Sequence, residues 1–549
     1  MTARTAERLV ALAAFAAVAV AAFTPFTNVA HVASAINEGD GRVQAWVLGW
    51  VAHAITTGRP LFDANMFFPA PEALAHTDHM AALGALAVPI WLATGNAVLA
   101  FNLLQLAGPA LAGWGMFVLA RDWTDDAAAA AVSGVAFGFS SFVFLHNAHL
   151  NLTWLAGIPL GILALDRWWE QPTWPRLGAL WGVTIFTALV SWYLALMLGL
   201  VLAAYLVALV VARRGVPHAE TRAWQVVAGL ALGIAVLLPF VAPYLGRGAE
   251  AGEAAAFATD LRSYLVPSDV TWLGGLLHAR GWTEARGIWG EKTQFLGWLA
   301  LALASAGVVA GFRRRGLALP RWRVVFLVAV GTSGLLLSFG PAPSGWSLFD
   351  MLATVPGVGG FRATARFGVL VSFAVALLAG AGASWLWRGR RAWTRALAAA
   401  VVCLVLLAEV FVAHFPAQRP APFPMHPMYA RAAADGAVAA VALPMYAGQS
   451  IWFLEGDYLL FSTQGGFLPL ANGIGRWVPR SYAAIDQATR DFPSPAAAAI
   501  LRNFGITHVL FHGARFADAG ARRARAAEGR DFVEVFTDGA DVLFRVSYP

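Results

Sequence analysis

Repeated apolar runs of membrane-spanning length most constrain what this chain can fold into. A hydrocarbon core about 30 Å thick needs roughly 20 apolar residues in one helix, and such runs continue to residue 413. Hydrophobic residues make up 59% of the chain and charged residues only 13%, which is unlike soluble proteins. The pattern predicts a polytopic α-helical membrane protein with about eleven transmembrane helices. The expected spans are 10–26, 97–120, 127–145, 151–168, 177–190, 193–212, 224–243, 295–312, 324–339, 367–387 and 396–413.

Two apolar stretches need interpretation. One could form a single helix or two helices, and the other could cross the membrane or lie at its surface. Residues 177–212 would form a single helix of about 54 Å, so we expect a break near residues 191–193. Residues 80–94 are short and contain Pro89, which favours an interfacial or re-entrant helix. The first run is longer than the apolar core of a signal peptide, so we expect it to stay as the first helix.

Arginine placement predicts the orientation, because basic residues in short loops stay in the cytoplasm. The arginines between the runs, such as Arg121, Arg213 and Arg390, fall on one side. The opposite face then carries the first outer loop, 31–80, and the tail. The net charge of +7 is explained by these loops, and no basic face with interleaved aromatic residues indicates a nucleic-acid partner.

The tail begins with a proline-rich linker, FPAQRPAPFPMHP, which cannot continue a helix and marks a domain boundary. We therefore divide the chain into a transmembrane domain, 1–413, and an outer-face α/β domain, 414–549. Alternating and apolar stretches predict the elements of the second domain. They are strands at 438–443 and 506–511, a helix at 495–503, and a hairpin around Asp538 and Gly539.

The first outer loop carries the candidate catalytic acids. Glu38 and Asp40 follow the first helix in the sequence Glu-Gly-Asp-Gly, where glycines permit a tight turn that lowers the carboxylates toward the membrane. Paired carboxylates serve as a general base, bind a divalent cation or stabilise positive charge at a sugar carbon. Arg42 and Gln44 accompany them, and an amphipathic helix up to Thr57 is expected to lie along the interface. The alternative is an ordinary solvated loop acid.

Histidines mark two further stretches of the outer loops. His76, Asp78 and His79 have metal-ligand side chains, but without a distant partner pair they make a poor zinc site and better suit a polar cavity. Another group flanks a short outer turn, where its members could share a helical face or cap helix ends. That group is His146, His149 and Asn151.

The later outer loops supply charged candidates for substrate binding. Arg362 and Arg366 are four residues apart, so on a helix both would point the same way, as binding of a phosphate or pyrophosphate requires. The alternative is a pair of arginines that anchor a helix start at the interface. The remaining candidates are Tyr193, Glu291 and Lys292.

Taken together, these features resemble the bacterial polytopic glycosyltransferases of the GT-C fold. The shared pattern is the EGDG acid after the first helix, the first outer loop, the many short spans and the outer C-terminal domain. GDGRVQAW, FFP, HLNLTW, IPLGIL and VPGVGGFRATARFG look like one branch of such membrane proteins. The resemblance covers nearly the whole chain and implies a multi-pass protein of the bacterial inner (plasma) membrane with its N-terminus in the cytoplasm.

The resemblance also implies an activity. A hexosyl- or pentosyltransferase of this type moves a sugar, with inversion, from a polyprenyl-phosphate lipid to a glycan, lipid or protein acceptor. Asp40 would be the general base, with Glu38 as substitute, and Arg362 and Arg366 would hold the departing phosphate. The resemblance implies no certain cofactor. Whether a divalent metal is required stays open, because no second acidic motif is visible, and the ligands of such a metal are unknown. Two alternatives remain: a transporter or lipid flippase, and a non-catalytic envelope-assembly protein.

Overall fold

The chain divides into two compact units that are not contiguous in sequence. The helical unit contains Met1–Pro25 and Gln105–Gln418, and the mixed unit contains Phe26–Leu104 and Arg419–Pro549. The expected domain border after residue 413 lies close to Gln418, but the first outer loop groups with the tail and not with the spans. The computed structural model describes residues 3–23, 38–146, 148–212, 219–245, 253–282, 290–313, 319–342, 344–355, 357–412, 426–446, 454–475 and 477–548. Most of the proline-rich linker lies outside these residues.

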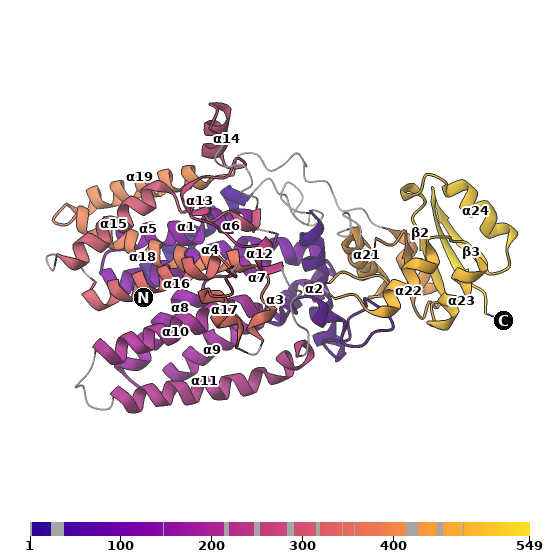
Figure 1. Cartoon of the computed structure of the whole chain (residues 1–549), viewed down its shortest axis with the longest axis horizontal. Coiled ribbons are helices and arrows are strands. Elements are labelled where there is room, and N and C mark those ends of the chain that lie inside the picture. Colours follow the sequence, from indigo (N-terminus) through magenta and orange to yellow (C-terminus); the bar gives the residue numbers. More distant parts are fainter. Residues whose placement is uncertain are drawn as a thin grey trace. The chain divides into compact units, whose positions relative to one another are not determined.

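The helical unit is organised around α18 (Gly368–Leu386), which packs against α5 (Ala127–Gly138), α15 (Trp298–Phe312) and α16 (Arg321–Ser338) (Figure 1). Glycines allow the closest of these contacts: a Cβ added at Gly307 or Gly382 would meet the opposing backbone at 2.3 or 2.0 Å. The other α-helices are α1 (Ala3–Phe23), α4 (Ala97–Thr124), α6 (Ser141–Leu145), α7 (Leu150–Thr153), α8 (Gly157–Glu170), α9 (Trp174–Val190), α10 (Trp192–Ala212), α11 (Ala219–Val241), α12 (Glu253–Ala256), α13 (Arg262–Leu265), α14 (Trp272–Ala279), α17 (Leu348–Ala353) and α19 (Ala392–Val410). The 3-10 helices are η2 (Ala242–Tyr244), η3 (Gly290–Lys292), η4 (Val358–Gly360) and η5 (Thr364–Phe367).

Each of the expected apolar runs contains a helix, and the break in the long run is confirmed because α9 ends at Val190 and α10 begins at Trp192. Within the described residues, 8 helices are long and apolar enough to cross a membrane, judged by length and composition alone. Three shorter apolar helices, Ala81–Thr94, Trp174–Val190 and Trp298–Phe312, fall below that length. The chain is thus a multi-pass α-helical membrane protein, and the number of crossings stays a prediction.

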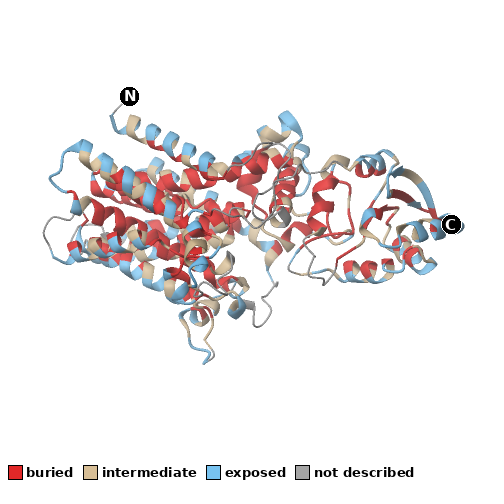
Figure 2. Ribbon diagram, turned by 90° about the horizontal axis from the view of Figure 1, so that it is seen from above, coloured by how far each residue is buried: buried red, intermediate tan, exposed pale blue. Residues whose placement is uncertain are grey.

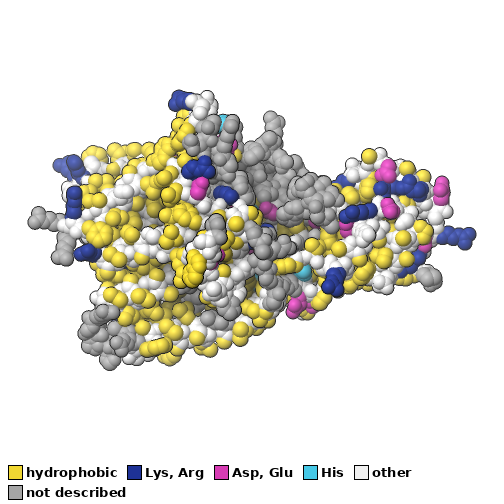
Figure 3. All heavy atoms as spheres, viewed as in Figure 1, with side chains coloured by type: hydrophobic (Ala, Val, Ile, Leu, Met, Phe, Trp, Pro, Cys, Tyr) yellow, Lys and Arg dark blue, Asp and Glu magenta, His cyan; other side chains and the backbone are white. Residues whose placement is uncertain are grey.

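The surface of the helical unit is apolar, as a lipid environment requires. Buried residues lie mainly where helices adjoin one another (Figure 2). Large hydrophobic side chains such as Val207, Leu238 and Leu404 are exposed. Figure 3 shows hydrophobic side chains across the visible face of this unit, with a small number of basic side chains between them. Charged side chains are more frequent on the visible face of the mixed unit (Figure 3).

The mixed unit contains a four-stranded sheet in the order β1-β2-β4-β3. β1 (Ala440–Leu443) pairs parallel with β2 (His508–Phe511), and β4 (Asp541–Val546) pairs antiparallel with β2 and with β3 (Phe532–Asp538). These strands confirm the elements expected from the tail, including the hairpin at Asp538 and Gly539. The helices of the unit are α2 (Glu38–Thr57), η1 (Ala73–His76), α3 (Ala81–Thr94), α20 (Pro427–Ala434), α21 (Glu455–Ser462), η7 (Thr463–Gly465), α22 (Arg480–Thr489), α23 (Pro495–Asn503), η8 (Gly513–Arg515) and α24 (Ala519–Glu528).

The first outer loop is bonded into the core of the mixed unit. The buried side chain of Asn65 accepts from Trp46 Nε1 at 2.9 Å and donates to Ser462 Oγ at 2.8 Å and to the Leu468 carbonyl at 2.9 Å. The backbone of Phe67 donates to Asn472 O at 2.8 Å. A buried amide with all these partners fixes one register between the segments, so loop and tail form one folded body.

The start of helix α2 differs from the expectation. The helix begins at Glu38, so the expected tight turn is wrong and Asp40 lies in the first helical turn. Trp46 and Trp50 are fully buried and α2 packs against α3 and α21; the position of α2 along the interface stays a prediction. The glycines cost about 1 kcal/mol each in a helix, which burial of two tryptophans offsets.

A buried carboxyl in the mixed unit predicts a pH dependence of stability. Burial raises the pKa of Glu455 to about 7, although its oxygens accept from Tyr446 N, Asn472 Nδ2 and Tyr482 Oη at 2.8, 2.9 and 3.0 Å. The raised pKa means that the folded state holds a proton that the unfolded chain releases near pH 4.3. The free energy of unfolding should therefore fall by about 3 kcal/mol between about pH 4.3 and pH 7.

Thermal unfolding of the purified protein at pH 5 and pH 8 checks this. Glu455→Gln should flatten the pH slope while losing some stability at every pH, because its amide cannot accept all three hydrogen bonds. An unchanged slope in the variant would assign the pH dependence to another group.

Candidate functional site

A buried ion pair joins two segments that connect helices in the helical unit. Arg366 Nη2 donates to Glu291 Oε1 at 2.6 Å and Arg366 Nε donates to Glu291 Oε2 at 3.2 Å. The side chains are 10% and 14% exposed. The pair is bidentate, the geometry that best fixes a guanidinium plane. Two 3-10 helices in contact, η3 and η5, present these side chains.

Two more of the sequence candidates meet this pair. His146 Nε2 lies 3.2 Å from Glu291 Oε2, and its Nδ1 lies 2.9 Å from the Phe142 carbonyl. The guanidinium of Arg366 stacks on the ring of Tyr193 at 4.6 Å. Four separate segments thus bring His146, Tyr193, Glu291 and Arg366 together, and we call these four residues the arginine cluster.

The charges of the arginine cluster follow from its contacts. Burial alone would raise the pKa of Glu291, but the charge of Arg366 and the contact with His146 hold that pKa well below its ordinary value. Burial lowers the pKa of His146 against the opposing effect of Glu291. At neutral pH the cluster therefore holds one guanidinium, one carboxylate and a neutral imidazole.

The arginines at 362 and 366 do not share a helical face, so that expectation is wrong. Phe361–Ala363 forms no regular secondary structure and only Thr364–Phe367 forms η5. Arg362 lies over the ring of Phe257 at 5.3 Å, whereas Arg366 faces Glu291. The conformation differs because Tyr193 Oη accepts from the Ala363 backbone at 3.0 Å, which holds the chain outside a helix.

The two histidines of the short turn, His146 and His149, lie at the ends of two different helices. His146 takes the C-cap position of α6 and His149 the N-cap position of α7, but His149 makes no side-chain capping hydrogen bond there. Their rings lie 5.9 Å apart, which also places His149 beside the cluster. Asn151 is buried within α7. Lys292 follows Glu291 in η3 and is partly exposed.

Sequence reasoning missed Gln294. Its side chain is 1% exposed, and within the described residues neither amide atom has a hydrogen-bond partner. It packs against Gly368, where an added Cβ would meet its oxygen at 2.2 Å. A buried amide without partners is rare in folded proteins. In the sequence, only its position three residues after Glu291 could have indicated Gln294 as a site residue. Such a spacing is common and does not by itself identify a binding residue.

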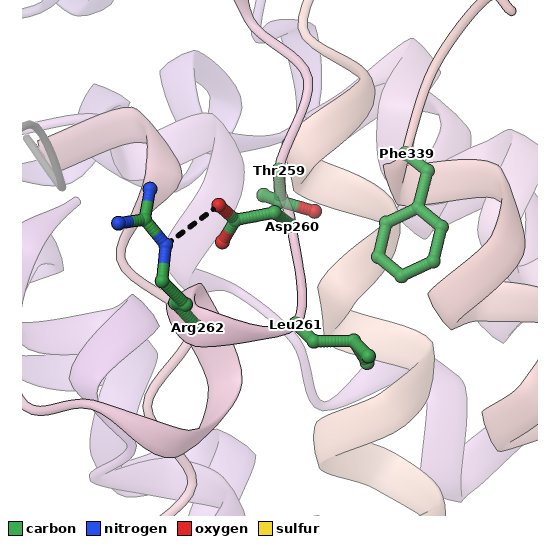
Figure 4. A pocket seen from close by; sticks show the side chains of 5 residues that line it. All are labelled: Thr259, Asp260, Leu261, Arg262 and Phe339. Atoms are coloured by element: carbon green, nitrogen blue, oxygen red, sulfur yellow. Dashed lines mark hydrogen bonds and ion pairs between the residues drawn. The ribbon is translucent and has the colours of Figure 1, made fainter.

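A pocket of about 420 Å³ lies on a neighbouring loop of the helical unit. Figure 4 shows the paired side chains of Asp260 and Arg262 on one side and those of Leu261 and Phe339 on the other. The ion pair is 3.0 Å long and about half exposed. Residues that flank the pocket are hydrogen-bonded to the segments that carry the arginine cluster. Phe257 O accepts from Ala365 N at 3.1 Å, and Ser263 O accepts from Gln294 N at 3.1 Å. The pocket thus combines polar and apolar walls beside the cluster's loops.

The candidate acids of the first outer loop lie in the mixed unit. Asp40 is partly exposed in the first turn of α2, where the helix N-terminus stabilises its negative charge. The side chain of Glu38 lies outside the described residues. Arg42 forms a 2.6 Å ion pair with Asp457 of α21, and Gln44 is partly exposed on the same helix.

The histidines at 76 and 79 have structural contacts in the mixed unit. His76 Nδ1 contacts the Trp477 carbonyl. His79 is buried, its Nδ1 accepts from Ala81 N at 2.9 Å at the start of α3, and burial lowers its pKa to about 4. Asp78, between them, is partly exposed. Within the described residues these three do not form a metal-ligand group.

Comparisons with known proteins bear on family and fold. A family model described as "Domain of unknown function (DUF6311)" matches residues 9–409. The search of curated proteins found no match. Among solved structures, the chain is similar to the arabinofuranosyltransferase AftD from Mycobacteria, with a TM-score of 0.61 and 16% identity. That likeness covers 100% of this chain and 42% of the enzyme, so the chain spans about two fifths of the enzyme's length.

Two weaker likenesses are to membrane proteins of other organisms. The oligosaccharyltransferase AglB from Archaeoglobus fulgidus gives a TM-score of 0.47 and 14% identity over 92% of this chain and 69% of that one. ArnT from Cupriavidus metallidurans gives 0.39 and 13% over 97% of each chain. Identities this low bear on the fold alone. Of the three likenesses, that to AftD exceeds a TM-score of 0.5. It confirms the predicted GT-C fold.

Proposed function

The chain belongs to the family described as a domain of unknown function (DUF6311), and we propose from its fold and its candidate site that it is a membrane glycosyltransferase. It moves a sugar from a polyprenyl-phosphate lipid to an acceptor at the outer face of the bacterial inner membrane. The observation that carries this proposal is the buried arginine cluster in a GT-C fold. A guanidinium held in one plane among membrane helices suits the phosphate of a lipid-linked donor.

The charge around the cluster supports a phosphate ligand. Arg362, Arg366 and Lys292 contribute three positive charges and Glu291 one negative charge, which leaves two positive charges on the loops of η3 and η5. Polyprenyl phosphate is an anion, and a low-dielectric surrounding strengthens its attraction to these groups. The buried amide of Gln294 adds a donor and an acceptor suited to a sugar hydroxyl or phosphate oxygen.

The reaction balances with the residues at hand. An acceptor hydroxyl attacks the anomeric carbon of the donor sugar, and its oxygen forms the new glycosidic bond. The bond between that carbon and the phosphate oxygen breaks, and the lipid phosphate leaves with the electron pair. A general base takes the proton of the hydroxyl, and we propose Asp40 of the mixed unit for this role. A cation stabilises the charge that develops on the phosphate, and we propose Arg366 of the helical unit for that role. Separate variants of Asp40 and Arg366 test the two assignments. Attack opposite the leaving group inverts the anomeric centre.

Transfer assays test the proposal and separate it from its alternatives. The purified protein in nanodiscs is given a panel of polyprenyl-phosphate sugars, and mass spectrometry follows both the glycosylated acceptor and the released lipid phosphate. We expect one lipid phosphate released for each sugar transferred. A flippase would move the lipid intact, and an assembly protein would leave the whole panel unchanged. Spheroplasts should transfer sugar from externally added donor, whereas inside-out vesicles should not.

A further inference from the structure

Three metal-ligand side chains that the proposed reaction does not use converge in the mixed unit. His426, His512 and Asp541 each offer a ligand atom within 4.8 Å of the others. His512 is buried, and the other two are partly exposed. We call these three residues the His-His-Asp cluster.

The spacing of the ligand atoms fits a small divalent ion. Asp541 Oδ2 lies 3.6 Å from His426 Nδ1 and 3.5 Å from His512 Nδ1. Zinc bound at about 2.0–2.1 Å in tetrahedral geometry requires ligand atoms about 3.3–3.4 Å apart. The two distances to Asp541 therefore need little adjustment. The side chain of His426 is 23% exposed, which leaves its ring room to complete the geometry.

The fold brings the three residues together from separate elements. His512 directly follows β2 and Asp541 begins β4, and the pairing of Phe511 with Val542 sets them opposite one another. His426 is the N-cap of α20. The cluster thus lies at the carboxyl end of β2, whose parallel partner is β1, and the carboxyl edge of parallel strands is a frequent ligand-binding position.

Neighbouring side chains orient both imidazoles. His512 Nε2 lies 3.0 Å from Tyr429 Oη, so the Nδ1 side of the ring is directed to Asp541. Its ring stacks on Tyr458 at 4.8 Å, and the ring of His426 lies 4.2 Å from Phe461. Metal-bound histidines ordinarily have such a partner on the second nitrogen. The cation Arg515 is nearby, and its ion pair with Asp457 at 3.0 Å offsets its charge.

We propose that His426, His512 and Asp541 bind one zinc-class divalent ion, with a fourth coordination position open to water or a ligand oxygen. Two neutral nitrogen donors and one carboxylate favour a transition ion over Mg²⁺ or Ca²⁺, which take oxygen ligands. The bound ion would tie the start of α20 to the end of the sheet.

Metal binding to the full chain tests the proposal. The protein is purified in detergent with a tag that contains no histidine, stripped with a chelator that is then removed, and titrated with Zn²⁺ by calorimetry. We expect one equivalent to bind, a millimolar excess of Mg²⁺ to leave binding unchanged, and Co²⁺ to give the intense absorption of a four-coordinate site. Bound Zn²⁺ should also raise the unfolding temperature, because it binds only the folded state.

The variants decide whether this cluster is the site. Asp541→Asn and His426→Ala should each weaken Zn²⁺ binding by at least about tenfold. His426 is partly exposed, so its variant should still fold if Asp541→Asn does not. Asp435→Asn is the matched control, because Asp435 pairs with His508 at 3.0 Å on the same sheet outside the cluster. Absence of binding by the wild type, or equal binding by His426→Ala, would overturn the proposal.

Discussion

Asp40→Asn is expected to lower the rate of sugar transfer by about 10²–10⁴, the usual effect of removing a positioned general base. The substitution keeps the size of the side chain and its hydrogen-bonding capacity but removes the charge that accepts a proton. Asp40 is partly exposed in the first turn of α2, so its neutralisation should change the free energy of unfolding by less than about 1 kcal/mol. Transfer rate and thermal unfolding are measured on the same preparation.

Two controls make the Asp40→Asn result specific. Glu72→Gln neutralises an exposed carboxylate of the same outer loop and should transfer sugar at the wild-type rate. Glu38→Gln tests the neighbouring acid, which would be the base if Asp40→Asn kept full activity. If both variants kept it, the assembly-protein interpretation would become the better one.

Arg366→Ala should have the largest effect on stability. It leaves the Glu291 carboxylate, whose side chain is 14% exposed, without its bidentate partner. Breaking a buried pair by removing one partner costs about 3–5 kcal/mol. We therefore expect a lower unfolding temperature together with lost transfer, so the single variant cannot separate structure from function.

The double variant Arg366→Met, Glu291→Met separates the two effects. Replacing both charges with apolar side chains of similar volume is often neutral for stability, so the unfolding temperature should return close to that of the wild type. Transfer should stay lost, because methionine cannot hold the departing phosphate. A double variant with restored stability and wild-type transfer would show that the arginine cluster only supports the fold.

Some of the fold could be predicted because it follows from local rules. Length alone required a break in residues 177–212, and the structure ends α9 at Val190. The hairpin at Asp538 and Gly539 followed from alternation around a turn. Glu291 and Arg366 were selected separately as charged residues of outer loops, and the structure pairs them because a buried charge needs a partner.

Other features depend on long-range packing that the sequence does not encode locally. Glycines suggested a turn at Asp40, but burial of Trp46 and Trp50 makes the segment helical. The grouping of the first loop with the tail rests on single buried polar contacts such as those of Asn65. The His-His-Asp cluster comes from three separate segments, so no ligand spacing along the chain indicates it.

The central claim is that this protein breaks the bond between a sugar and a polyprenyl phosphate with Asp40 as base. The most direct test is single-turnover release of lipid phosphate from a saturating lipid-linked sugar by purified protein in nanodiscs. The wild type should release phosphate in step with the appearance of glycosylated acceptor, and Asp40→Asn should bind the same donor but release it at least about 10²-fold more slowly. Release at equal rates by both proteins would contradict the claim.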